Sequence, residues 1–541
     1  MALLAAAPVP AQTFTVLHRF LPDGVDGVTP SATLTLNDGV LYGITVKGGT
    51  NNGGTAFRVD ATGANYQVLH HFAPLNVNPT NLDVTADGSA PMGGLTVADG
   101  AIYGATEGGG AAGRGALYKA GTNGADYQVM HHFIDFHDGS YPGSRLFLTS
   151  GFLYGSCFYD GGDNRLDHEY VAAGGTQFVI GTNGGEFQVL STFQKYVPDP
   201  VVAPAYDLVL VPTNAMNTFG FIGVSLDGGG LGPEMQSIAG INIVGGGGSA
   251  YGSIYGVSEG GTFFHYHKFT GGADGAYPAG SGVLTGGFGS YVMYGVTAGE
   301  GTNTAGTVYR YDIQNDVFQV LHTFINDFGS GTQYTNGTVP VGKLVLMDNK
   351  LYGVTKWGGG GYANGGYGVL YRVNTDGTDF KVLHRFDADK EGGLPLAGLL
   401  AVDKVLYGTT TAYGSADGSG TGQGTIFKFD LNPPPLWLKP VPVFVITNQV
   451  IAITNPFNTI HPVVYITNHL SYSYPSLAVT WNLNDGLAHT LLKSSDMSLS
   501  ISNWTPVPPN WTNQTQVEAG ALINPNPGDP PTFFRLHSIV P

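Results

Sequence analysis

Phe318-Gln-Val-Leu-His-Thr-Phe324 is a seven-residue segment that recurs along the chain. Large apolar residues alternate in it with smaller or polar ones, which is the period-two pattern of a strand with one buried face. Successive copies begin 52 to 76 residues apart, which indicates an array or a propeller rather than a domain built on one core. The seven copies occupy residues 14–20, 66–72, 127–133, 187–193, 263–269, 318–324 and 380–386.

Three further strands are predicted between successive copies. In one unit, Gly94-Leu-Thr-Val97 is a first strand, Ala101-Ile-Tyr-Gly-Ala-Thr106 a second and Ala116-Leu-Tyr-Lys119 a third. Glycine-rich runs join them, and the copy at 127–133 follows as the fourth strand. Four short strands in about 50–60 residues, linked by Gly-rich turns, are typical of a β-propeller blade.

The two ends of the repeat predict how a ring would close. Segment 14–20 is a fourth strand with no blade before it, whereas the unit at 394–430 has three strands and no fourth. Placing 14–20 beside 425–429 completes that blade and removes two unpaired strand edges. We therefore predict an all-β protein with a seven-bladed β-propeller closed by its N-terminal strand. Eight blades are the alternative, if the divergent stretch 204–262 holds two degenerate ones.

The composition changes on either side of the repeat, which predicts three parts. Residues 1–12 resemble the remnant of an export signal, because Val9-x-Ala11 has the small residues that signal peptidase accepts, although a basic start is missing. An irregular apolar N-terminus is the alternative. The propeller is expected over 13–431. After Asn432-Pro-Pro-Pro435, strand-like runs within 436–541 predict a small C-terminal β-sandwich.

Composition also excludes several classes of protein. The formal net charge of −17, with no cluster of Lys or Arg to offset it, argues against nucleic-acid binding. A lone cysteine, Cys157, excludes an internal disulfide and a cysteine-based zinc site. No apolar run reaches the ~18 residues that a membrane-spanning helix needs. The 29 Tyr and 29 Phe argue against disorder.

The spaced motifs together resemble a known family. They are Leu-Tyr-Gly-x-Thr with Gly-Gly, Gly-Thr-hydrophobic-Tyr/Phe-Arg/Lys, F-x-V-L-H-x-F and D-G-x-x-P, which are similar to the Gloeobacter/Verrucomicrobia-type (GloVer, choice-of-anchor) tandem repeat of exported bacterial proteins. The resemblance covers about 14–430. A Kelch propeller also has Gly-Gly after its second strand, but the Kelch tryptophan is missing here. The resemblance implies an exported, secreted or cell-surface repeat protein and no particular activity.

Histidines in the fourth strands are the first candidate functional residues. A ring of metal-binding imidazoles is one interpretation, but copies one blade apart are too distant to share an ion. The alternative is a half-buried histidine that bonds to a neighbouring turn. The set read at one strand position is His18, His71, His132, His267, His322 and His384.

An acidic position four residues before a proline falls in the connections between blades. Such connections gather on one face of a propeller, where a ring of carboxylates would suit Ca²⁺ or another hard cation. The alternative is an Asx-turn, which Asp before Gly commonly makes with its own backbone. The acidic residues are Asp26, Asp87, Asp138, Asp274 and Glu391, with Asn336 in the sixth place.

Three loops between second and third strands stand out. The loop of blade three concentrates charge in a chain otherwise poor in it, so a carboxylate pair there would suit glycoside cleavage and an Asp/His/Glu set a metal. A solvated loop is the alternative. Its catalytic candidates are Asp163, Asp167, His168 and Glu169. The loops of blades six and seven carry aromatics that would stack on sugars or fold back over glycines, namely Trp357, Tyr362, Tyr367 and Tyr413.

Three functions follow from these features. The leading hypothesis is an extracellular protein that binds a polysaccharide through the aromatic loops. The second is a carbohydrate-active enzyme, a glycoside hydrolase or polysaccharide lyase, which uses the acids of blade three. The third is a structural or adhesive component of a surface layer or filament, in which the propellers self-assemble.

Overall fold

The computed structural model describes residues 12–21, 23–74, 85–134, 138–159, 175–193, 201–212, 219–228, 251–258, 263–287, 290–299, 304–325, 335–360, 366–415 and 422–431, and beyond these only the strands β33 to β39. The chain divides into two compact units. One is Thr13–Leu431, and the other combines Met1–Gln12 with Asn432–Pro541. Each unit is considered by itself.

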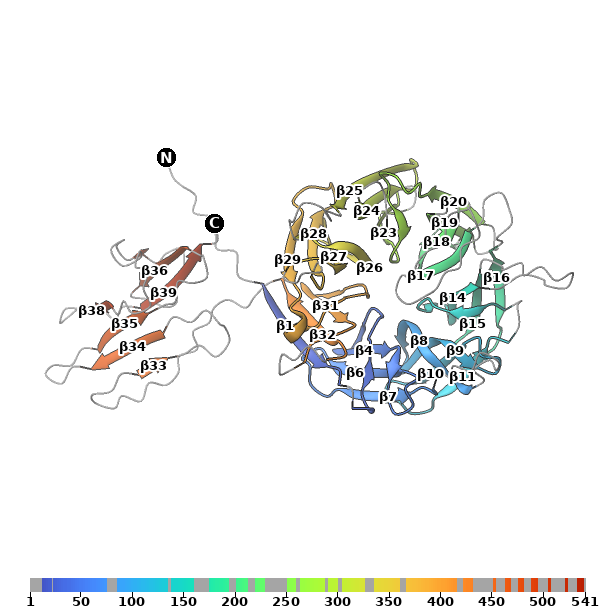
Figure 1. Ribbon diagram of the computed structural model, residues 1–541, viewed down its shortest axis with the longest axis horizontal. Coiled ribbons are helices and arrows are strands. Elements are labelled where there is room, and N and C mark those ends of the chain that lie inside the picture. The colour runs from blue at the N-terminus through green and yellow to red at the C-terminus, as the bar shows by residue number, and fades with distance from the viewer. Residues whose placement is uncertain are drawn as a thin grey trace, which may run out of the picture. The chain divides into compact units, whose positions relative to one another are not determined.

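Seven antiparallel sheets of four or five strands form the blades of the unit Thr13–Leu431, and Figure 1 shows them arranged as a ring. In blades one to three the strands run in chain order. Blade one contains β3 (Thr35–Asn37), β4 (Val40–Thr45), β6 (Thr55–Asp60) and β7 (Gln67–His71). Blade two contains β8 (Thr85–Ala98), β9 (Ala101–Gly110), β10 (Ala116–Gly121) and β11 (Gln128–His132). Blade three contains β12 (Ser140–Pro142), β13 (Phe147–Thr149), β14 (Phe152–Tyr159), β15 (Thr176–Gly181) and β16 (Gln188–Thr192).

Blades four to six repeat the same order. Blade four contains β17 (Val201–Pro212), β18 (Phe219–Gly228), β19 (Ser253–Ser258) and β20 (Phe263–Lys268). Blade five contains β21 (Ala276–Pro278), β22 (Val283–Thr285), β23 (Val292–Gly299), β24 (Thr304–Asp312) and β25 (Val317–Ile325). Blade six contains β26 (Thr338–Met347), β27 (Lys350–Trp357), β28 (Val369–Asn374) and β29 (Lys381–Arg385).

Blade seven joins the two ends of the unit. It contains β30 (Leu400–Val402), β31 (Val405–Thr410), β32 (Thr425–Asp430) and, as its fourth strand, β1 (Thr13–Arg19). In the antiparallel register, Phe14 lies opposite Phe429 and Arg19 opposite Thr425. The predicted closure by the N-terminal strand is therefore confirmed. The number of blades is seven, since the divergent stretch 204–262 contributes to the single sheet of blade four.

Two smaller elements lie in the connections between blades. The two-residue strands β2 (Gly27–Val28) and β5 (Lys47–Gly48) pair with each other beside blade one. The single turn of helix α1 (Ala388–Glu391) lies between blades six and seven, and the side chain of Asp387 caps its N-terminus. No helix within the described ranges is long and apolar enough to cross a membrane.

The blades pack face to face through their second and third strands. In the first boundary, Tyr42 and Ile44 of β4 belong to one buried cluster with Leu95, Ile102 and Tyr118 of blade two. Side chains alternate along a strand, so β4 turns every second residue toward the next blade. The core of the ring is therefore a succession of contacts between neighbouring sheets.

The glycine of each second strand has a steric reason. It lies under the large aromatic ring of the third strand, and a Cβ atom there would come within 2.3–2.5 Å of the outer end of that ring. Any larger residue would clash, because real Cβ contacts do not reach such distances. The seven glycines are Gly43, Gly104, Gly155, Gly223, Gly295, Gly353 and Gly408.

The other unit contains two antiparallel sheets beyond residue 450. One sheet contains β33 (Ile451–Ile453), β34 (Val463–Asn468), β35 (Pro475–Thr480) and β38 (Ala521–Ile523). The second contains β37 (Thr505–Pro506), β36 (Ala488–Ser494) and β39 (Phe533–Ile539). The β character of this part matches the expectation, and its sandwich packing stays a prediction.

Candidate functional site

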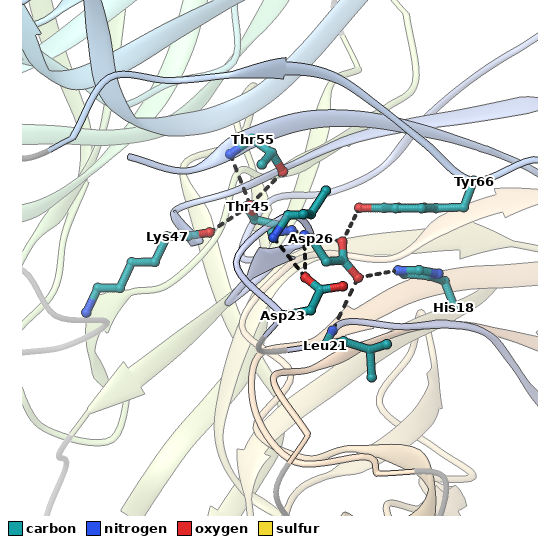
Figure 2. Close-up of polar contacts among 10 residues, drawn as sticks. His18, Leu21, Asp23, Asp26, Thr45, Lys47, Thr55 and Tyr66 are labelled. Atoms are coloured by element: carbon teal, nitrogen blue, oxygen red, sulfur yellow. Dashed lines mark hydrogen bonds and ion pairs between the residues drawn. The ribbon is translucent and has the colours of Figure 1, made fainter. Parts of the chain in front are cut away.

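A polar network occupies the boundary where blade seven meets blade one, and Figure 2 shows its members. The carboxylate of Asp26 lies 3.0 Å from Nε2 of His18 and accepts a 2.5 Å hydrogen bond from the hydroxyl of Tyr66. It also accepts backbone N–H groups of Leu21 at 3.2 Å and Gly27 at 2.8 Å. Burial, and then the charge of Asp26, raises the pKa of Tyr66, so this hydroxyl stays a donor.

We call the boundaries between neighbouring blades seams, and the same pair of a histidine and an acid recurs at five of them. In each, Nε2 of a fourth-strand histidine lies within 3.3 Å of a carboxylate oxygen in the connection that follows. The pairs are His18–Asp26 at 3.0 Å, His70–Asp87 at 3.0 Å, His131–Asp138 at 3.2 Å, His267–Asp274 at 3.3 Å and His384–Glu391 at 2.7 Å. These acids and the histidines therefore stabilise the links between blades.

Each seam histidine also stacks on an aromatic ring from the next blade. The ring centroids lie 3.6–4.2 Å apart and the planes differ by at most 9°. The pairs are His18–Tyr66, His70–Tyr127, His131–Phe187, His267–Phe318, His322–Phe380 and His384–Phe14. In six of the seven repeat segments, the aromatic residue that begins the segment is thus the partner of the histidine one repeat earlier around the ring.

Two of the histidines assigned from the sequence were wrong by one residue. His70 and His131, not His71 and His132, occupy the position that faces the acid. The histidine is the fifth residue of the repeat, which is His70 in 66–72 and His131 in 127–133, so the assignment was one residue too far along. Alternation along the strand places only this residue of each doubled pair in the seam. His71 and His132 instead accept, through Nδ1, the backbone N–H groups of Thr50 and Ala111 in glycine-rich loops.

The seams leave no shared ligand set for a cation in the described part of the chain. Each carboxylate is occupied by the histidine of its own seam, and no three His, Cys, Asp or Glu side chains in those residues gather closely enough to hold a metal ion. This arrangement agrees with the interpretation of a half-buried histidine bonded to a neighbouring turn. The predicted Ca²⁺ site remains a prediction without a cluster to carry it.

The seam between blades five and six departs from the pattern. Asn336 stands at the acidic position and is exposed, and Nε2 of His322 is buried with no hydrogen-bond partner among the described residues. Burial lowers the pKa of His322 to about 4. In the seam between blades three and four, Ser191 replaces the histidine, and the connection at 194–200 lies outside the described residues.

The aromatic loops of blades six and seven meet at one seam. Tyr367 and Tyr413 form an edge-to-face pair with ring centroids 5.1 Å apart. The carbonyl of Tyr367 accepts the N–H of Leu394 at 2.9 Å, and the carbonyl of Leu394 accepts the hydroxyl of Thr411 at 2.7 Å. The expectation that these two loops lie side by side therefore holds for Tyr367 and Tyr413. Tyr362 lies outside the described residues.

Trp357 differs from the two tyrosines in its exposure. It is the last residue of β27, and 39% of it is exposed, whereas Tyr367 and Tyr413 are half-buried. A backbone bridge joins Gly358, the next residue, to Tyr367. The indole therefore lies at the end of blade six from which the Tyr367 loop also departs. Nζ of Lys356 lies 5.6 Å from the centroid of the Trp357 ring, within the range of a cation–π contact.

The catalytic candidates of blade three lie outside the described residues. They are Asp163, Asp167, His168 and Glu169. The hypothesis of a carbohydrate-active enzyme therefore rests on the sequence alone.

Comparison with known proteins concerns the family and the fold. The Gloeobacter/Verrucomicrobia repeat model matches residues 294–438. The predicted resemblance is confirmed there. This Gloeobacter/Verrucomicrobia-type stretch contains the aromatic loops of blades six and seven and the seams of His322 and His384. Among curated proteins, none matches the chain.

The solved structures that resemble the chain are distant. One is an oligogalacturonate lyase from Vibrio parahaemolyticus, with 10% identity, 79% of this chain and 98% of that chain covered, and a TM-score of 0.41. Another is the β-propeller domain of the Trilobed protease from Pyrococcus furiosus. It has 10% identity, 74% of this chain and 96% of that chain covered, and a TM-score of 0.38. A third is the GH93 α-L-arabinofuranosidase of Fusarium graminearum. It has 12% identity, 77% of this chain and 97% of that chain covered, and a TM-score of 0.36. The seven-bladed fold rests on the strand pairing.

Proposed function

We propose that this is an exported extracellular or cell-surface protein that binds a polysaccharide through the loops on one face of its propeller. The observation that carries the proposal is the aromatic group at blades six and seven. An exposed indole, Trp357, ends β27, and the Tyr367–Tyr413 pair lies where the neighbouring loops meet. We call these three residues the aromatic face.

The topology explains why the aromatic face lies on a single side of the ring. In a four-stranded antiparallel blade, the loop from the second to the third strand and the connection to the next blade leave from the same end. Trp357 and Tyr367 flank such a loop in blade six, and Tyr413 lies in the equivalent loop of blade seven. Adjacent blades thus place these loops beside one another.

The chemistry of the aromatic face suits a sugar. The C–H groups of a pyranose ring form an apolar surface that stacks on an aromatic ring, while its hydroxyls stay available to polar groups. The hydrogen bonds at Leu394 and Thr411 hold the two tyrosine loops together, so little conformational entropy is lost on binding. Rigid loops on a closed β scaffold commonly carry binding sites.

Export is the second part of the proposal. The small, apolar residues at 1–12 supply the pattern of a signal remnant, and the repeat resembles that of exported bacterial proteins. Fractionation of the source culture tests this part, and recovery of the protein only inside the cells would contradict it.

Binding is tested with the full-length protein on a panel of immobilised polysaccharides. Trp357→Ala, Tyr367→Ala and Tyr413→Ala should each weaken retention of the polymer that the unaltered protein binds. Val317→Ala is the matched control, because Val317 is 49% exposed and begins β25 at the opposite end of its blade. Unchanged retention of all three aromatic variants would remove the aromatic face from the binding site.

A further inference from the structure

Lys356 is a cation in an unusual setting beside the aromatic face. It is the penultimate residue of β27, half-buried, with its ammonium group 5.6 Å from the Trp357 ring centroid. No carboxylate among the described residues lies within 4.0 Å of its Nζ, and burial lowers its pKa. A partly desolvated ammonium without an anionic partner is unfavourable unless a ligand supplies one.

Three other lysines of the same two blades are paired with carboxylates. Each has a carboxylate oxygen within 3.9 Å of Nζ, although all three side chains are more than half exposed. They are Lys381 with Asp379, Lys390 with Asp387, and Lys404 with Asp348. Lys350 and Lys428 of these blades form no ion pair with a described residue either, so the feature that distinguishes Lys356 is the position of its ammonium group beside the exposed Trp357 ring.

The blade itself does not need a cation at this position. The residue that follows the threonine of the second strand differs from blade to blade, and most of the equivalents are uncharged. In the blades where a threonine precedes it, this residue is Val46, Glu107, Ala298, Lys356 and Thr411. The hydroxyl of Thr355 bonds to the carbonyl of Trp357 at 2.8 Å and so fixes the end of β27 without help from Lys356.

We propose that Lys356 and Trp357 together bind an anionic sugar residue. The sugar ring stacks on the exposed indole, and its acidic substituent, a uronate carboxylate or a sulfate ester, pairs with the ammonium group of Lys356. This inference rests on the proposed polysaccharide binding and names the class of polymer. A charge-assisted contact in a partly desolvated place contributes enough to set a preference of about tenfold or more over the neutral sugar.

Because the protein as a whole repels polyanions, a preference for a charged polymer over its neutral counterpart would point to a local binding site. A net charge of −17 repels an anionic polymer at long range, so non-specific adsorption works against binding. Retention of a polyanion would therefore come from a local site. Its affinity should fall with added salt, because the contact between Lys356 and the acidic group is screened.

The experiment measures binding of the full-length protein to two matched pairs of polymers. Polygalacturonate is compared with fully methyl-esterified polygalacturonate, and dextran sulfate with dextran, so that the two arms separate a carboxylate from a sulfate. We expect the unaltered protein to bind one charged polymer about tenfold or more tightly than its neutral counterpart. Lys356→Met should abolish this preference, and Lys356→Arg should retain it.

Two controls make the outcome specific. Lys350→Met removes the same charge at the other end of β27 and should leave the preference intact. Thermal unfolding of each variant shows that the fold is retained. If Lys356→Met keeps the preference, or the unaltered protein binds only neutral polymers, the inference is wrong while the proposed function stands. If no polymer binds, both are wrong.

Discussion

The imidazole of His384, on the outer strand of blade six, stacks on the ring of Phe14, with centroids 4.2 Å apart and planes 7° from parallel. Phe14 lies in β1, the strand that closes blade seven. The contact that joins the end of the repeat to its beginning is thus the same contact that joins every other histidine-bearing seam. The ring closes without a special device, because the N-terminal strand is an ordinary member of the repeat.

Phe14→Ala should therefore weaken the closing seam. It removes the stack on His384 and the packing against Phe386 and Phe427, and for a half-buried ring we expect a loss of about 1–3 kcal/mol in the free energy of unfolding. Urea denaturation measures it. Thr15→Ala, an exposed position on the same strand, is the control and should change stability by about 0.5 kcal/mol or less. Equal effects of the two variants would contradict the role of the stack.

Asp26 should be the most sensitive acid of the seams, because four donors converge on it. Asp26→Ala leaves the Tyr66 hydroxyl and the His18 imidazole without their acceptor, at a cost of about 2–4 kcal/mol. In the Asp26→Ala background, Tyr66→Phe should cost less than it does in the unaltered protein, because the hydroxyl has already lost its partner. A double-mutant cycle from urea midpoints measures this coupling, and strictly additive effects would refute it.

His322 predicts a pH dependence with a defined sign. Its folded-state pKa of about 4 lies below the ~6.5 of an unfolded histidine. Between these two pH values the imidazole is protonated in the unfolded chain but stays neutral in the folded protein. Stability is fully present above pH ~6.5 and is lost as the pH falls toward 4, with a slope of at most about 1.4 kcal/mol per pH unit. His322→Phe keeps a ring against Phe380 and should remove this part of the acid sensitivity. Parallel stability curves for the two proteins would show that His322 does not contribute.

Asn336→Asp should supply the acid that this seam lacks. A carboxylate facing Nε2 would raise the pKa of His322 and satisfy a buried donor, so we expect a gain of about 1 kcal/mol near pH 6 and a weaker loss on acidification. Titration of the His322 imidazole by NMR reports the pKa directly. Asn336→Ala is the control and should shift neither quantity. If the pKa of His322 stays low in the Asn336→Asp protein, the carboxylate at position 336 does not reach the seam and the prediction is wrong.

The glycines of the second strands predict that any added side chain will clash with the aromatic ring of the third strand. Gly104→Ala places a Cβ atom 2.4 Å from the Tyr118 hydroxyl, and overpacking of this kind costs about 1–3 kcal/mol. Tyr118→Leu should relieve part of that cost in the double variant. Gly287→Ala is the control, since no atom lies within 4 Å of the added methyl group. A Gly104→Ala protein as stable as the control would contradict the close approach.

Much of the ring could be predicted from the sequence because its signals are local. Period-two alternation marks each strand, and the spare fourth strand at 14–20 matches the missing one after 425–429. A half-buried histidine bonded to a neighbouring turn was one of the two interpretations, but Asp26 was not identified as the partner of His18, since no local signal shows how the turn after the strand folds back. The stack of His18 on Tyr66 joins different blades, and alternation within one strand carries no information about it.

The candidate binding site could be predicted only in part. Aromatic residues among glycines indicated the loops of Trp357, Tyr367 and Tyr413, and adjacency of blades indicated that they meet. The difference between an exposed indole and two half-buried tyrosines depends on packing across the seam and has no local signal. The unpaired ammonium of Lys356 was missed for the same reason, because the partners of a charge are set by the three-dimensional arrangement.

The pairing of β1 with β32 also bears on biosynthesis. Within the propeller the ribosome makes β1 first and β32 last, so β1 has no partner strand until the rest of the ring has been synthesised. A product that terminates before residue 425 has nothing to hold β1, and its free edge marks the chain for proteolysis or aggregation. Only a chain synthesised through to residue 430 hides both edges, so the closing contact doubles as a check that translation went far enough.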